Sequence, residues 1–427
     1  MAILLLFACV LSLVLINVPI AVALGIVAVT ALFVTQGLSS LPNLPIVLYN
    51  GATNFPLLAI PLFILAGSIM NASGISRRLI AFASSLLGWM RGGLSIVSIG
   101  TSLFFAEISG SAVADVAALG SVLIPAMQSR GYSKEFAAAV MSSAATLAVI
   151  IPPSIPMVLY AVMADTSVVQ LFVAGIVPGL IGGLGLMAMA YWFARRYKFP
   201  VEESFQLKRV KQTFKDAFWA FFLPVIILGS IFGGLVTATE GAAMAVLAAL
   251  FIGIFVYREL DMPHLRTAMI DGGVQTAVVM LLVATSGLLG VYLTESQVPQ
   301  RLAASIMEFT SNKYAVLAIL NVLFLVLGLF LHSAAAIILT VPIVLPLVKA
   351  AGIDPVHFGL IVTINLGIGQ QTPPVASVLM TACAIAKADM WEVTKVNIYF
   401  ISVLLAVLLL VTYVPVTGMG LVEFFYR

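Results

Sequence analysis

Charged side chains are scarce in this sequence of 427 residues. Asp, Glu, Lys and Arg make up 9% of the chain and hydrophobic residues 62%, whereas an ordinary soluble protein has about 25% charged residues. A helix needs about 20 largely apolar residues to cross the hydrocarbon core of a bilayer. We therefore expect an all-α polytopic membrane protein with about ten to twelve transmembrane helices. The uncharged runs are 1–76, 136–164, 166–194, 217–239, 241–257, 272–294, 314–348, 358–386 and 396–422.

Residues that carry metal or catalytic chemistry are also few. The chain has three His residues, and its two cysteines, Cys9 and Cys383, lie far apart in apolar stretches without metal-type spacing. An intramembrane enzyme needs a nucleophile–base pair or a metal-ligand set inside the spans, and we find none. A net charge of +3 provides no basic stripe for nucleic acid. We expect no enzymatic activity, no cofactor and no nucleic-acid partner.

The longest polar stretch covers residues 195–216, at the midpoint of the chain. It holds seven basic and three acidic residues, and by the positive-inside rule we place it in the cytoplasm. Phe205, Val210 and Phe214 suggest the apolar stripe of a helix lying on the membrane surface. We divide the chain into a first repeat at 1–194, this cytoplasmic basic amphipathic linker at 195–216, and a second repeat at 217–427.

The two halves align without gaps in their middle portions, at one constant shift. Each half contains a small-residue segment, a helix ending at proline, a loop with glycine, and a helix broken by a Pro-Pro pair. If each half crosses the membrane an odd number of times, the repeats are inverted, as in several transporter folds whose site lies at the repeat interface. The aligned positions are Pro125 with Pro346, Gly131 with Gly352, and Pro152-Pro153 with Pro373-Pro374.

The broken segments 142–156 and 363–377 can bind a cation. A tandem proline removes amide donors, and the carbonyls it frees must meet protein, water or a cation because lipid cannot satisfy them. Hard oxygens without fixed charge suit Na⁺ and suit a transition metal poorly, and half-helix N-termini attract carboxylates. The alternative is a proline kink with Ser and Thr packed between helices. The polar side chains beside the breaks are Ser142, Ser143, Thr146, Ser154, Thr363, Asn365, Gln370, Gln371, Thr372 and Ser377.

A few ionisable residues lie in apolar surroundings. Glu107 and Asp115 flank the first small-residue segment, and His332 occupies the matching place in the second. They are candidates for proton transfer, for solvation in a cavity, or for hydrogen bonds to a hairpin tip. Glu240 fits a helix N-terminus that Thr237 or Thr239 caps.

Several sequence motifs of this chain resemble those of a known family. GSAVADVAALGSVLIPAM, followed by RGYSKEFAAAV and IIPPSIPM, is similar to the first half of the large membrane subunit of tripartite ATP-independent periplasmic (TRAP) transporters. GGLVTATEGAAMAV resembles the opening of that family's second half, where proline often stands at Ala238. His332 departs from the smaller residue expected at the second hairpin tip.

The resemblance implies an elevator-type transporter with two re-entrant hairpins and two broken helices. It implies Na⁺-coupled import of a C4-dicarboxylate or a sialic acid across the bacterial inner membrane. It also implies two partners, a small four-helix membrane subunit and a periplasmic substrate-binding protein. A stand-alone Na⁺/carboxylate symporter, an H⁺-coupled version and an uncoupled channel stay open as alternatives.

Carried onto this chain, the resemblance places the hairpin tips around 109–112 and 331–334 and the cation sites beside them, with Na⁺ as the only metal. The first Na⁺ site comprises Ser109, Gly110, Ser111, Thr146, Pro152 and Ser154. The second comprises Leu331, His332, Ser333, Asn365, Gly367, Thr372 and Pro373. The candidate substrate contacts are Ser111, Asp115, Ser154, Ser333, Gln370, Gln371 and Ser377.

Overall fold

The fold is known from a computed structural model, which describes residues 8–10, 12–14, 16, 18–199, 205–310 and 312–426, with the backbone alone at 39–41, 107–109 and 309. These residues form helices and connections and no β-strand. Ten of the helical stretches in this part of the chain are long and apolar enough to cross a membrane. The prediction of an all-α polytopic membrane protein is confirmed.

The helices of the two halves are as follows. The first half contains α2 (Ile20–Gln36), η1 (Gly37–Asn43), α3 (Leu44–Ala52), η2 (Phe55–Leu58), α4 (Ala59–Ala72), α5 (Ile75–Leu87), α6 (Gly93–Ser109), α7 (Ala112–Asp115), η3 (Val116–Gly120), α8 (Ser121–Ser129), α9 (Lys134–Ala145), α10 (Leu147–Ile150), α11 (Ile155–Ala164) and α12 (Val168–Arg196). The second half contains α13 (Leu207–Phe232), α14 (Ala238–Phe251), η4 (Ile252–Val256), α15 (Met262–Glu295), α16 (Val298–Phe309), α17 (Lys313–Phe330), α18 (Ser333–Ala350), α19 (Pro355–Gly369), α20 (Ser377–Ala386), α21 (Met390–Tyr413) and α22 (Val416–Tyr426).

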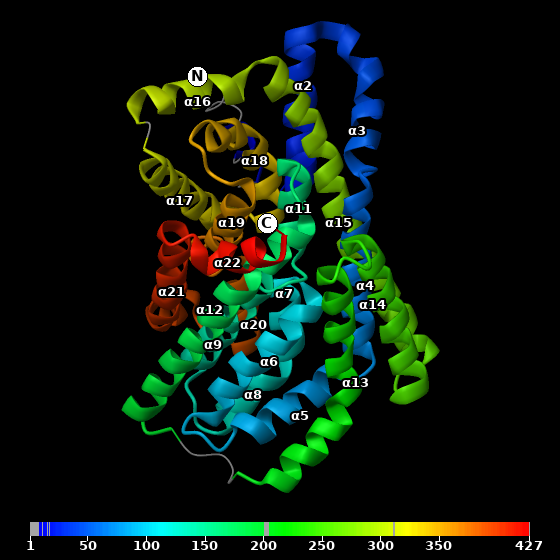
Figure 1. The fold of residues 1–427 in the computed structure, drawn as a ribbon, viewed down its shortest axis with the longest axis vertical. Coiled ribbons are helices and arrows are strands. Elements are labelled where there is room, and N and C mark those ends of the chain that lie inside the picture. The colour runs from blue at the N-terminus through cyan, green and yellow to red at the C-terminus, as the bar shows by residue number, and fades with distance from the viewer. Residues whose placement is uncertain are drawn as a thin grey trace.

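An outer wall of helices from both halves runs along one side of the molecule. The long helix α15 packs along α2, α3 and α4, while α14 packs on α4 and α13, and α13 packs on α5 (Figure 1). Only 33–39% of the most apolar window of α13, α14 and α15 is buried within the chain. The rest of these apolar surfaces is available to lipid or to another membrane subunit.

The core lies beside this wall and contains both broken helices. The stretch from Lys134 to Ala164 is 89% buried in its most apolar window, and it contacts α6, α12, α18, α19 and α21. In a helix surrounded by protein, backbone groups without an intrahelical hydrogen bond must bind other protein groups, water or an ion.

The elements of the second half repeat those of the first in the register that aligns Pro125 with Pro346. In this register the end of α17 falls on the end of α6, α18 begins with α7 and ends with α8, and α19 begins with α9. The N-caps before α9 and α19, Ser133 and Asp354, also coincide. The helices after the breaks, α11 and α20, each have ten residues, but α20 begins one position late, so the second break is longer. The duplication read from prolines and glycines therefore extends to helix bounds and caps.

The two hairpins enter the core from opposite ends. Figure 1 shows α8 near the lower end, where α12 ends and α13 begins, and α18 near the upper end. Each hairpin also packs on the helix that follows the break of the other half: α18 packs on α11, while α7, η3 and α8 pack on α20. This arrangement is that of inverted repeats.

The second half begins with α13 instead of a separate surface helix. The helix starts at Leu207 and continues to Phe232, so Val210 and Phe214 belong to the first turns of a membrane helix. Phe214 packs on Phe82, with ring centroids 5.7 Å apart. The amphipathic segment therefore continues into α13 without a break, since no glycine or proline stands between Leu207 and Phe222. Its location at the cytoplasmic surface stays a prediction.

The start of α14 confirms a local prediction. Thr237 is the N-cap: its Oγ1 accepts the Glu240 backbone N–H at 3.2 Å, and the Glu240 carboxylate accepts the Thr237 N–H at 2.7 Å. Such a reciprocal capping box satisfies two amide donors that the first helical turn leaves free.

Candidate functional site

The tip of the first hairpin touches the first helix break. The Gly110 carbonyl accepts the Ile155 N–H at 3.3 Å, and a Cβ atom at Gly110 would lie 2.8 Å from the Pro153 carbonyl oxygen. Gly110 also has φ 59°, a left-handed conformation that glycine adopts without steric cost. Ser111 follows as the N-cap of α7. The side chains of Ser109 and Glu107 lie outside the described part of the chain.

The first break holds a cluster of buried oxygens. The Thr146 Oγ1 donates to the Ser142 carbonyl at 3.1 Å, and the Ser154 Oγ donates to the Val149 carbonyl at 2.8 Å. The Ser142 Oγ is buried and has no hydrogen-bond partner among the described residues. The loop between α10 and α11 contains Pro152, whose peptide bond to Pro153 is cis.

The second hairpin also contacts the second break, through the last turn of α17 and through Ser333. The Leu329 carbonyl accepts the Val375 N–H at 3.2 Å, and the Gln370 Nε2 donates to the Ser333 Oγ. Leu331 is buried before α18, whereas the side chain of His332, the N-cap residue, is exposed. Thr372, which donates to the Ile368 carbonyl at 2.9 Å, precedes Pro373.

Asn365 has a free acceptor in the core beside this break. Its Nδ2 donates to the Asn321 Oδ1 at 2.7 Å and to the Ile361 carbonyl at 2.9 Å. Its Oδ1 is buried and has no donor among the described residues. Most buried polar atoms in native proteins have a partner, so an oxygen left open beside a helix break fits a cation ligand.

The two broken helices cross at positions that the repeat makes equivalent. Thr146 aligns with Gly367 in the register that places Pro152 on Pro373, and a Cβ atom at Gly367 would lie 2.9 Å from the Thr146 Cγ2. The local symmetry axis therefore passes near this contact. The first predicted cation site, which includes Thr146, and the second, which includes Gly367, therefore meet at this contact.

Gln371 bridges two helices through its side-chain oxygen, while its Nε2 is buried and has no hydrogen-bond partner among the described residues. Its Oε1 accepts from the Ser143 Oγ at 2.7 Å and from the Asn397 Nδ2 at 3.2 Å, and the side chain is fully buried. These bonds tie α9 to α21. Asp115 is likewise fully buried within the first hairpin. The assignments to the substrate stay predictions for all seven residues: Ser111, Asp115, Ser154, Ser333, Gln370, Gln371 and Ser377.

Asn321 and Asn397 were missed by the sequence analysis. Each is a lone amide in a membrane helix, Asn321 in α17 and Asn397 in α21, and each is bonded to a residue beside a break. A polar residue inside an uncharged span indicates a buried partner, which was the available signal. The sequence does not show which partner it faces.

A cleft of about 1030 Å³ separates the first hairpin from the outer wall. Ala114, Ala117 and Ala118 line it on the hairpin side, and Asn71 and Gln275 are among the polar residues on the wall side. Among the described residues no group of three or more His, Cys, Asp and Glu could hold a metal ion. The cleft gives the hairpin an open, partly polar surface.

The chain is similar to the members of a known protein family. Residues 7–417 match the family model described as "Tripartite ATP-independent periplasmic transporter, DctM component". A protein of Oleidesulfovibrio alaskensis named isethionate TRAP transporter permease protein DctMQ is 43% identical over 95% of this chain, which spans 64% of that relative's length. The C4-dicarboxylate TRAP transporter large permease protein DctM of Vibrio cholerae is 37% identical, with 97% of this chain and 96% of the relative covered.

One further relative and one solved structure are also similar to this chain. The 2,3-diketo-L-gulonate TRAP transporter large permease protein YiaN of Escherichia coli is 35% identical over 97% of both chains. The crystal structure of the Alcanivorax borkumensis YdaH transporter has a TM-score of 0.60, covering 90% of this chain and 91% of that one, at 15% sequence identity. At this low sequence identity, the similarity to the YdaH structure shows the fold alone.

Proposed function

Because this chain belongs to the DctM component family of tripartite ATP-independent periplasmic transporters, we propose that it imports an organic acid by Na⁺-coupled secondary transport as the large membrane subunit. The relatives are named transporter permeases, so the chain is a transport protein and not an enzyme. The substrates in their names are a sulfonate, C4-dicarboxylates and a sugar acid. All are organic anions, which supports an anionic substrate here.

The observation that carries the proposal is the pairing of each hairpin tip with a helix break. At the first tip, Gly110 accepts the N–H of Ile155, the first residue of α11. At the second tip, Ser333 accepts a hydrogen bond from Gln370, which directly follows α19. Na⁺ at the first site is assigned to the carbonyls and hydroxyls around Gly110, Thr146 and Ser154. Na⁺ at the second site is assigned to those around Asn365 and Thr372, with the free Asn365 Oδ1 as the best-supported ligand.

Coupling follows if cation and substrate prefer the same conformer. A bound cation places positive charge beside the hairpin tips, and a substrate carboxylate or sulfonate gains affinity from it. A ligand shifts a conformational equilibrium only through such differential affinity. An H⁺-coupled transporter would instead use a titrating side chain in this region, for which Asp115 and His332 are the candidates.

The proposed movement is an elevator displacement of the core against the outer wall. The cleft beside the first hairpin is lined by alanines on the hairpin side, and small side chains allow surfaces to slide and close. We place the basic linker on the cytoplasmic side of the bacterial inner membrane. The cleft then opens toward the cytoplasm and is the proposed release route. A small membrane subunit and a periplasmic substrate-binding protein are the proposed partners.

Uptake into proteoliposomes under an imposed Na⁺ gradient tests the proposal. Labelled carboxylates and sulfonates are offered with and without the small subunit and binding protein from the same source organism. Uptake that needs the gradient and all components supports the tripartite transporter. Uptake by this chain alone would make it a stand-alone symporter, and conductance without a coupled gradient would make it a channel.

The break itself is tested by replacing Pro373 and Pro374 together with Ala. We expect the helix to continue through the break and uptake to be lost, because the carbonyls are no longer free. The control is Pro178→Ala, which removes a proline within α12 that belongs to neither break. Wild-type uptake in the double variant would remove the break from the mechanism.

A further inference from the structure

A second cleft, of about 550 Å³, lies between α5, α13 and the end of η4 and shares Arg77 with the cleft beside the first hairpin. Its volume is in the range of small-ligand pockets, about 300–1,000 Å³. Three basic residues line it, Arg77 and Arg78 from α5 and Lys215 from α13, together with Trp219 and Tyr257. The cleft therefore combines positive charge with aromatic surface.

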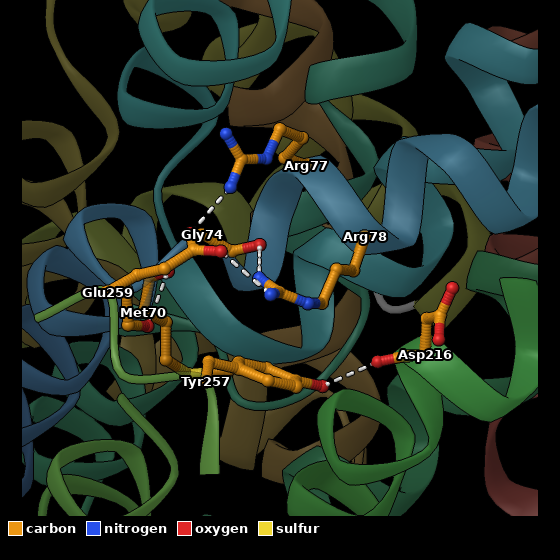
Figure 2. Close-up of polar contacts among 8 residues, drawn as sticks. Met70, Gly74, Arg77, Arg78, Asp216, Tyr257 and Glu259 are labelled. Carbon is orange, nitrogen blue, oxygen red and sulfur yellow. Dashed lines mark hydrogen bonds and ion pairs between the residues drawn. The ribbon is translucent and has the colours of Figure 1, made fainter. Parts of the chain in front are cut away.

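The arginines are held in place by a network that Figure 2 shows. Glu259 pairs with Arg77 at 2.6 Å and with Arg78 at 2.7 Å, and the Arg78 guanidinium lies 3.8 Å from the centre of the Tyr257 ring. The Tyr257 hydroxyl donates to the Asp216 carbonyl at 3.1 Å. These contacts join α5, α13 and the segment after η4 into a preformed wall.

The charges of this wall are not balanced. The hydrogen bond from Arg78 holds the pKa of Glu259 below its usual range, so the carboxylate is ionised at neutral pH. It still faces two guanidinium groups. No described residue forms an ion pair with the Lys215 ammonium group, and counting the Asp216 carboxylate the cleft keeps an excess of one positive charge.

The cleft lies where three segments change from charged to uncharged sequence. The uncharged run of α13 begins directly after Asp216, the run 241–257 ends at Tyr257, and no charge follows Arg78 until Arg91. Membrane helices make this change at the level of the lipid headgroups, where Trp and Tyr also gather. The basic residues are therefore at headgroup depth.

We propose that this cleft binds the phosphate headgroup of an anionic phospholipid. Lys215 and the arginines contact the phosphodiester, whose single negative charge matches the excess positive charge. Basic pockets between membrane helices suit such headgroups. The acyl chains then lie along the exposed aromatic face of α13, formed by Phe218, Trp219 and Phe222, which are 39–44% exposed. This face continues from the cleft into the hydrocarbon level and favours a lipid over a soluble phosphate compound.

Fluorescence quenching of Trp219 tests the proposal. Trp89, Trp192 and Trp391, the other tryptophans, are exposed and are replaced by Phe, so that Trp219 alone emits. The full chain is reconstituted in phosphatidylcholine vesicles that contain a minor fraction of phosphatidylglycerol with brominated acyl chains. Vesicles in which the phosphatidylcholine carries the bromine give the comparison. We expect stronger quenching by the anionic lipid than its share of the bilayer predicts.

The variant Lys215→Gln should weaken the preference for phosphatidylglycerol about fivefold, the usual contribution of one basic residue at a membrane surface. Arg195→Gln is the matched control: it removes one positive charge from the end of α12, where the guanidinium lies over Tyr191 and outside the cleft. The same preference in wild type and Lys215→Gln would overturn the proposal. Loss of the preference in both variants would also overturn it, because it would indicate a general surface charge.

A soluble competitor separates the two sources of phosphate. Glycerol phosphate added to the vesicles should leave the quenching by brominated phosphatidylglycerol unchanged. Displacement of the lipid by glycerol phosphate would assign the cleft to a soluble phosphate compound and overturn the lipid proposal. Native mass spectrometry of wild type and Lys215→Gln, with all tryptophans present, provides a second measurement in which wild type should retain more phosphatidylglycerol.

Discussion

The crossing of the two broken helices predicts a specific steric conflict. In the variant Gly367→Ala the new methyl group would lie 2.9 Å from the Thr146 Cγ2, whereas carbon atoms in contact are about 3.5–4.0 Å apart. Thr146 is fully buried and its hydroxyl is bonded to the Ser142 carbonyl, so it has little room to move. Overpacking of this kind costs about 1–3 kcal/mol.

Thermal unfolding of the detergent-solubilised protein measures this cost. One kcal/mol shifts Tm by about 2–4 °C in chains of 150–250 residues, so we expect Gly367→Ala to lower Tm by a few degrees. The control is Gly290→Ala in α15, where a Cβ atom would meet nothing within 4 Å. Alanine in place of a helical glycine stabilises by about 0.5–1 kcal/mol, so this control should unfold at the same or a higher temperature.

A second substitution tests whether Thr146 is the residue that the new methyl group at position 367 strikes. Thr146→Ser removes the Cγ2 methyl group and keeps the hydroxyl, so adding it to Gly367→Ala should restore most of the lost stability. Contacting residues show coupling energies of about 0.5–3 kcal/mol in such cycles. Equal Tm values for Gly367→Ala and Gly290→Ala, or a double variant no better than Gly367→Ala, would refute the crossing.

The other predictions concern a cation ligand, an ion pair and a helix cap. Asn365→Ala should raise the Na⁺ concentration for half-maximal uptake about tenfold, since a charge-assisted contact contributes about 1.5–3 kcal/mol; an unchanged Na⁺ dependence would remove this ligand. Glu259, whose pKa is lowered chiefly by the Arg78 hydrogen bond, should stabilise wild type over Glu259→Gln above the unfolded pKa near 4.5. That advantage should disappear as the pH falls through the lower folded pKa, and a pH-independent Tm difference would contradict the assignment. Thr237→Ala should cost about 1 kcal/mol of stability through loss of the cap, measured as a lower Tm, while Thr237→Ser should preserve it.

The sequence predicted the helical membrane class, the repeat and the breaks because all three depend on local chemistry. Long apolar runs require helices in lipid, and the Pro-Pro pairs stand where the structure interrupts α10–α11 and α19–α20. The register of the repeat was visible from proline and glycine alone. These features can be read from the sequence because proline and glycine act directly on the backbone.

The contacts between distant segments could not be predicted in the same way. Nothing local indicates that Asn365 faces Asn321, or that Gln371 contacts Ser143 and Asn397. Hydroxyl and amide side chains near a break look alike in sequence, and only packing decides which are satisfied. The start of α13 was missed for a related reason: charged residues suggested a linker, although helix propensity does not distinguish the first turns of a long helix from a surface helix.

Simultaneous measurement of ²²Na⁺ and labelled substrate flux tests the central claim most directly. The complete transporter is reconstituted in proteoliposomes, and both fluxes are followed with no other ion gradient. Two sites at two breaks predict that Na⁺ enters with the substrate at two ions per molecule, and that Asn365→Ala lowers this ratio. Substrate uptake driven by a pH gradient, with no accompanying Na⁺ flux, would contradict the account.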